Sequence, residues 1–209
     1  MSDLVMNGKS KVSGGEYEEV RIDGISTVDG DLTCDIMEVD GICELNGNVR
    51  VKGKADTDGI ITISGSLDAE YLDIDGTCKI YGNLNSEEME VDGVLAVTGN
   101  ITAENAKLTG GLSLDGTFNA GSLELKFYNS PKIKEIVGGR IHITHGTNVR
   151  HLKAELIEGD EISIERSKVK VVRGDNITIG ESCTVDKVEY RSSLSIHPKS
   201  KVKEKIKLE

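Results

Sequence analysis

Five aspartates in the first half of the chain each precede a glycine that recurs every 17 or 18 residues, and this column is the feature most suggestive of chemistry. They are Asp23, Asp40, Asp58, Asp75 and Asp92. Carboxylates stacked in a row repel one another, and a bound cation such as calcium would relieve that repulsion. However, Asp before Gly is ordinary turn chemistry, and salt screens exposed charges at this spacing. We therefore favour turn formation and expect no metal site.

Histidine gives a second candidate for metal chemistry. The chain has four histidines, three of them within ten residues: His142, His145, His151 and His197. A three-histidine zinc site on a triangular β-helix would be similar to the gamma-class carbonic anhydrases. The alternation of Ile141 and Ile143 points His142 outward, and no acidic partner group is evident. We expect surface histidines here.

Cysteine chemistry is not indicated. Cys34, Cys43, Cys78 and Cys183 show no C-x-x-C spacing, which excludes the common zinc and thioredoxin-like signatures. Cys43 and Cys78 occupy one repeat position two coils apart, about 9–10 Å at ordinary strand spacing. A disulfide needs Cα atoms within about 7 Å. All four should be small buried hydrophobic residues.

Motifs for nucleotide use and for nucleophilic catalysis are missing from the sequence. Neither G-x-x-x-x-G-K-[ST] nor G-x-G-x-x-G nor G-x-S-x-G occurs. Hexapeptide-repeat transferases share a prism shape but normally add a projecting loop with a catalytic histidine, and the regular coils here contain no histidine. We predict no catalytic residue, no cofactor-binding residue and no enzyme activity. The alternative is a β-helix enzyme of the hexapeptide-transferase or gamma-carbonic-anhydrase type.

Charge is divided unevenly along the chain. Residues 1–121 carry 23 acids against 8 bases, a net of −15, and residues 122–209 carry 13 acids against 17 bases, a net of +4. The acidic half disfavours nucleic acid as a partner. No apolar run approaches the roughly 20 residues that cross a bilayer, and the N-terminus shows no secretory signal. We expect a cytoplasmic protein.

The elements that carry these residues are repeats. One glycine recurs at steps of 17, 18, 17, 17 and 17 residues: Gly24, Gly41, Gly59, Gly76, Gly93 and Gly110. A second glycine follows each after six residues. Relative to the first glycine, apolar residues recur at −2 and +4, and mainly smaller residues at +10. Two residues before each of these positions lies another residue that should point inward, because side chains alternate between the two faces of a β-strand. This predicts a triangular all-β solenoid of about 17 residues per coil.

Corner chemistry is expected at both glycines. Each glycine is expected where one short strand turns a corner into the next, and such a corner often needs a positive φ, which glycine adopts readily. A small polar residue follows the second glycine in every coil: Asp31, Asn48, Ser66, Asn83, Asn100 and Thr117. These side chains should bond local turn backbone and stack into ladders along the prism.

The chain divides into two repeat families. We assign residues 1–121 to the regular coils, with a degenerate first copy, and residues 122–137 to a seam that breaks the rhythm. Residues 138–209 form a second, less regular solenoid with a Lys-rich terminal cap, and 151–158 could be a short helical turn. Its paired apolar residues are Ile141/Ile143, Ile162/Ile164, Ile177/Ile179 and Leu194/Ile196, followed by Val149, Val169, Val185 and Val202.

The repeat V-D-G-x-x-x-[VIL]-x-G-[DNS]-[LIV] resembles that of the bactofilins over about residues 17–121, as in VDGVLAVTGNITA (91–103). The resemblance implies a right-handed β-helix that polymerises end to end without nucleotide into bacterial cytoskeletal scaffolds affecting shape, polarity or motility. The second solenoid looks like a two-part Gram-positive variant. Disordered flanking tails are missing, which puts membrane attachment in doubt. Other bactofilin-like or cell-envelope proteins are possible partners.

Assembly is also expected on physical grounds. Each end of a solenoid exposes unpaired strand edges around an apolar centre, which is a surface for pairing with another chain. We expect Leu4, Met6 and Val12 to lie at the N-terminal end and Leu194, Ile196 and Val202 near the other. Filaments require both ends to be open. If the Lys-rich tail covers the last coil, head-to-head dimers would form instead.

Overall fold

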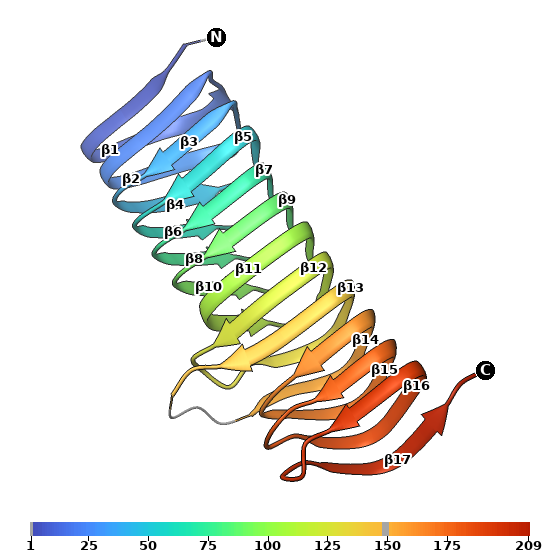
Figure 1. Ribbon diagram of the computed structural model, residues 1–209. Coiled ribbons are helices and arrows are strands. Elements are labelled where there is room, and N and C mark those ends of the chain that lie inside the picture. The colour runs from blue at the N-terminus through green and yellow to red at the C-terminus, as the bar shows by residue number, and fades with distance from the viewer. Residues whose placement is uncertain (1, 148–150) are drawn as a thin grey trace.

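The computed structural model describes residues 2–147 and 151–209, and in these residues it contains strands and no helix. All strand pairings are parallel and join one continuous sheet that winds along the molecular axis (Figure 1). The strands are β1 Leu4–Glu16, β2 Glu19–Cys34, β3 Ile36–Val39, β4 Ile42–Asn46, β5 Val49–Thr57, β6 Ile60–Ile63, β7 Leu67–Ile74, β8 Thr77–Ile80, β9 Leu84–Val91, β10 Val94–Val97, β11 Ile101–Leu114, β12 Thr117–Phe127, β13 Lys132–His145, β14 Leu152–Ile164, β15 Ser167–Ile179, β16 Thr184–Ile196 and β17 Lys201–Lys207.

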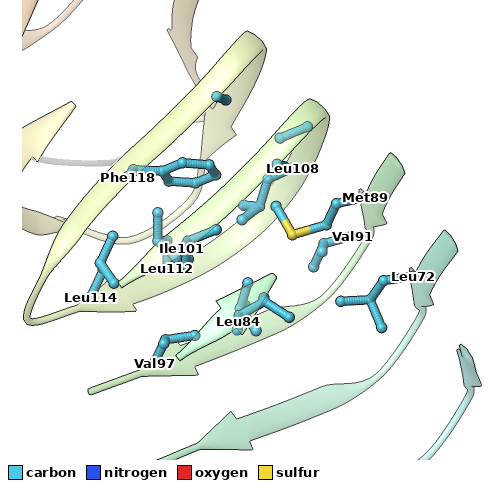
Figure 2. Close-up of a cluster of buried hydrophobic side chains, with 14 of the residues drawn as sticks. Leu72, Leu84, Met89, Val91, Val97, Ile101, Leu108, Leu112, Leu114 and Phe118 are labelled. Carbon is cyan, nitrogen blue, oxygen red and sulfur yellow. The ribbon is translucent and has the colours of Figure 1, made fainter. Parts of the chain in front are cut away.

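The fold is a parallel β-solenoid of about 12 turns with about 17 residues per turn, which confirms the predicted class. Each regular coil buries two side chains on each of three short segments. In the coil around Gly41 these are Met37/Val39, Cys43/Leu45 and Val49/Val51. Alternation at period two therefore fills a central core with one layer of side chains per coil (Figure 2).

The predicted core columns are confirmed with one exception. Every residue at −2 and +4 from the first glycine is buried, including Thr57 at the −2 position. The +10 column is also buried apart from Ser86, which is half-buried. Its hydroxyl donates to the carbonyl oxygens of Glu88, at 2.7 Å, and Glu70, at 3.2 Å. A hydroxyl at this position satisfies backbone groups, so it stays at the edge of the core.

The predicted role of the glycines is wrong at most corners. Positive φ occurs at Gly24, Gly30 and Gly110 among the regular coils, and the remaining corner glycines do not adopt it. The requirement is close approach instead. A Cβ on Gly59 would overlap the carbonyl oxygen of Gly41, and one on Gly76 would overlap that of Gly59. Successive corners stack backbone on backbone, which leaves no space for a side chain.

The predicted polar ladder is confirmed, although its partners differ from expectation. Five of the six side chains, all except Thr117, accept a hydrogen bond from the backbone N–H of their counterpart in the next coil, rather than from their own turn. Asn48 N–H donates to Asp31 Oδ1 at 2.7 Å, and Asn83 N–H donates to Ser66 Oγ at 3.0 Å. Ser66, Asn100 and Thr117 donate in the same way, at 2.9–3.0 Å. The ladder thus satisfies corner N–H groups that have no strand partner.

The ladder gives a direct test. Asn83→Ala removes the Oδ1 that accepts from Asn100 N–H at 2.9 Å. We expect the free energy of unfolding to fall by about 1 kcal/mol, measured by thermal and denaturant unfolding. Asn83→Ser keeps an acceptor of the kind that Ser66 already supplies and should cost less. Equal losses for both variants would show that the acceptor contributes nothing.

The solenoid continues through the change of repeat. β12 pairs with β13 from Thr117↔Glu135 to Phe127↔His145 across residues 128–131. Both phenylalanines of the chain, Phe118 and Phe127, lie in β12 and are fully buried. The paired apolar residues of the second family stack in the predicted register, since Ile162 pairs with Ile141 and Ile177.

The helical turn predicted at 151–158 is wrong, because these residues begin β14. Leu152, Ala154 and Ile157 point into the core, and the backbone pairs with β13 on one side and β15 on the other. Pairing on both edges outweighs the helix propensity of Leu, Lys, Ala and Glu. Val149 lies outside the described residues. Val169, Val185 and Val202 stack as one column.

Candidate functional site

The aspartates before the first glycine stand in one exposed column, one per coil. Partial desolvation, and then the neighbouring Asp73, Asp58, Asp92 and Asp56, raise the pKa of Asp75. Within the described residues no group of three or more His, Cys, Asp or Glu side chains could hold a metal ion. In the part of the chain that the structure describes, the column is thus a line of neighbouring negative charges.

Among the described residues, the histidines do not form part of a group that could hold a metal ion. His142 is exposed, as its alternation with Ile141 and Ile143 predicts. His145 lies against Phe127, with ring centroids 6.4 Å apart, and its Nε2 is 3.9 Å from a carboxylate oxygen of Glu165. Nδ1 of His197 accepts from the N–H of Lys199 at 3.2 Å. Each of these rings has its own local surroundings.

The four cysteines are free and buried. Burial raises the pKa of Cys43 and Cys78 to about 12, and burial together with Asp35 raises that of Cys34 to about 11. Burial also raises the pKa of Cys183. A thiol is a nucleophile only as the thiolate, so these environments oppose cysteine chemistry.

The N-terminal end of the solenoid is formed by β1, which pairs with β2 along one edge. In the described residues its other edge has no strand beside it. Leu4, Val12 and Tyr17 pack against the core but remain partly exposed. Met6 is different: its side chain is 2% exposed and belongs to the core. The expected N-terminal residues thus lie on one end, with Met6 beneath that surface.

The C-terminal end is also open. β17 pairs with residues 184–190 of β16, so it forms a last partial rung of the solenoid. Beyond it, the outer edge of β16 at residues 192–196 carries no partner strand among the described pairings. Leu194, Ile196 and Val202 are half-buried here, together with Tyr190. The structure gathers the expected residues at this end too.

Sequence reasoning missed two kinds of residue. Tyr17 and Tyr190 contribute to the ends, although they lie outside the repeat positions from which the ends were inferred. A lysine-lined groove on β13–β16 was also missed. Lysines alternating with apolar residues were visible in the sequence, but their alignment depends on coil lengths that vary in this segment.

A regular parallel solenoid with partly apolar ends defines the molecule as a repeat protein with unpaired strand edges at its ends. Residues 37–127, a little under half of the chain, match the family model for Bactofilin, described as polymer-forming cytoskeletal. This match supports membership of the bactofilin family and a polymer-forming scaffold role. The match begins and ends later than the stretch 17–121 that the repeat suggested.

Two relatives from Bacillus subtilis (strain 168) match parts of the chain. It is similar to "Uncharacterized protein YhbF", with 31% identity over 96 residues, 43% of this chain and 41% of the relative. It is similar to "Uncharacterized protein YhbE", with 42% identity over 57 residues, 27% of this chain and 24% of the relative. The chain thus spans less than half the length of either relative. No solved structure gives a significant match. In the described residues no helix could cross a membrane.

Proposed function

We propose that this protein is a non-enzymatic cytoplasmic scaffold that stacks end to end without nucleotide and supports cell shape, polarity or motility structures. The observation that carries the proposal is the pair of open ends, each with free strand edges and half-buried apolar side chains. The polymer-forming description of the matched family supports the same role. Its partner is a second copy, and other bactofilin-like or cell-envelope proteins are further candidates.

Stacking is favourable because it extends the two interactions that already hold each coil to the next, namely strand pairing and the burial of apolar side chains. A strand edge from a second copy would pair the free N–H and C=O groups of β1 or of β16 and β17. It would also cover Leu4 and Val12 at one end, or Leu194, Ile196 and Val202 at the other. Burial of apolar surface contributes roughly 25 cal/mol per Å². Neither term requires a nucleotide.

The proposal is tested by charges placed on the ends. Val12→Arg and Leu194→Arg put a cation where the stacked copy would lie, and we expect each to remove filaments from sedimentation and electron microscopy. Val5→Arg and Ser195→Arg are matched controls, because these exposed residues lie on the same strands and point away from the core. The controls should assemble as the wild type does.

Assembly of Val12→Arg and Leu194→Arg at the wild-type level would overturn the proposed end contacts. Circular dichroism of each variant separates a lost contact from a lost fold. Met6→Lys is unsuitable for this purpose, since Met6 is 2% exposed and a buried ammonium group would destabilise the first coil itself.

A further inference from the structure

A groove of about 620 Å³ runs along the outside of β13, β14, β15 and β16. Its floor includes Ile133, Ala154 and Val169, which are successive members of one column. Long side chains from the residues on either side of that column form two walls. The groove therefore follows the solenoid axis and crosses four coils.

One wall of the groove is a column of lysines without acidic partners. Lys132, Lys153 and Lys168 stack in register. None of the three has a carboxylate within ion-pair distance among the described residues, whereas in the other wall Lys170 lies 2.8 Å from Glu155. The pKa of nearby His151 is lowered, first by desolvation and then by Lys168, Arg166 and Lys153. This wall therefore presents positive charge. The groove also contains Asp115, Glu155 and Asp186, of which Glu155 pairs with Lys170 and Asp186 with Lys203.

The complementary feature is an edge of the N-terminal half. The residue after each first glycine points outward, and it is a β-branched apolar residue in four of the coils. Ile25, Ile42, Ile60 and Val94 are 55%, 48%, 49% and 48% exposed. These residues stack from coil to coil: Ile25 pairs with Ile42, Ile42 with Ile60, and Thr77 with both Ile60 and Val94. The aspartate column lies on the other side of the same glycines. We use the name acidic edge for this feature, which consists of the aspartates before these glycines and the exposed apolar residues after them, from Asp23 to Val94.

The acidic edge and the groove share one spacing. Both are built from stacked parallel strands, so successive aspartates and successive lysines are each separated by about 4.8 Å. A contact made at one coil is thus repeated at the next. The apolar residues of the edge would face the aliphatic stems of the lysines, since Ile133, Ala154 and Val169 beneath them are buried in the core. Charge sign and repeat distance therefore match.

We propose that the acidic edge of one copy lies lengthwise in the lysine groove of a second copy, so that the rods associate side by side. The two surfaces lie in different halves of the chain, which makes the contact heterologous. Such contacts pass from copy to copy, unless two antiparallel copies each place their edge in the other's groove. This lateral association goes beyond the end-to-end stacking proposed above and uses none of its residues.

The test is a charge swap. Lys153→Glu/Lys168→Glu reverses the groove, and Asp58→Lys/Asp75→Lys reverses the edge. All four side chains are exposed, so the fold should tolerate them. We expect each variant alone to lose side-by-side association at low salt, with at least a tenfold weaker self-association by sedimentation. A mixture of the two should recover it, because each supplies the surface that the other lacks.

Arg50→Glu/Lys52→Glu is the matched control, with the same change in net charge on exposed residues of β5. It should associate as the wild type does. Association that persists in Lys153→Glu/Lys168→Glu, or a mixture that fails to recover it, would overturn the proposal. The proposal would also be overturned if Lys153→Glu/Lys168→Glu kept its self-association but lost binding to phosphatidylglycerol vesicles or to a single-stranded oligonucleotide. The groove would then serve another partner.

The measurement separates this contact from end-to-end stacking when it is repeated in the Val12→Arg/Leu194→Arg background. Rods with blocked ends should still associate laterally at low salt and separate at high salt. Loss of filaments in that background with lateral association intact supports both contacts. Filaments that persist there refute the end contacts alone.

Discussion

Gly76→Val should lower the stability of the solenoid more than any conservative surface change. A Cβ at this position would overlap the carbonyl oxygen of Gly59, and the neighbouring atoms are backbone, which cannot swing aside as a side chain can. The corner must open, and the strands on both sides lose register. We expect the free energy of unfolding to fall by more than about 3 kcal/mol, measured by denaturant and thermal unfolding followed by circular dichroism.

The matched control is Gly111→Ala, next to a corner glycine of a later coil. Its added Cβ would lie 3.4 Å from a Val94 methyl group, at the limit of ordinary contact. It should therefore change stability by less than about 1 kcal/mol. If Gly76→Val proves as mild as Gly111→Ala, backbone stacking at the corners is not what requires glycine.

Phe118→Ala should have the second large effect. Phe118 is fully buried in β12, where the regular coils meet the less regular ones. Removing the ring leaves a cavity, and such changes cost about 3–5 kcal/mol. In a solenoid each coil contacts only its neighbours, so weakening one layer also weakens the coupling between the segments on either side. We expect the thermal unfolding curve to separate into two transitions.

Leu72→Ala is the control for that separation. Leu72 is as deeply buried, but it lies within the regular coils. Its loss should cost about 2–5 kcal/mol without creating a second transition between the two segments. The proposed division into 1–121 and 138–209 around a seam at 122–137 fails if both variants unfold in the same single step.

The solenoid itself was predictable because each coil repeats the same short pattern. Six coils in register identify the inward positions, and Val39, Leu45 and Val51 are buried as that pattern requires. The reason for the glycines was not predictable. A positive φ and a close approach both select glycine, and only the packing of Gly76 over Gly59 distinguishes them.

The second half was harder to predict, because its coil lengths vary. Residues 151–158 have good helix formers, and only pairing with β13 and β15 shows that they are extended. The residues expected near the two ends lie in the first and last strands, as the order of the coils requires, yet Met6 proved to be core. The lysine groove was missed because Lys132, Lys153 and Lys168 follow each other after 21 and 15 residues. Their alignment depends on where each loop lengthens the coil.

Negative-stain electron microscopy of the purified protein, with and without added nucleotide, tests the central claim most directly. We expect filaments that form equally in both samples and that grow by stacking of rods end to end. The Val12→Arg and Leu194→Arg variants, examined on the same grids, should appear as short single rods. Single rods from the wild-type protein at every concentration, or filaments that appear only when nucleotide is present, would contradict it.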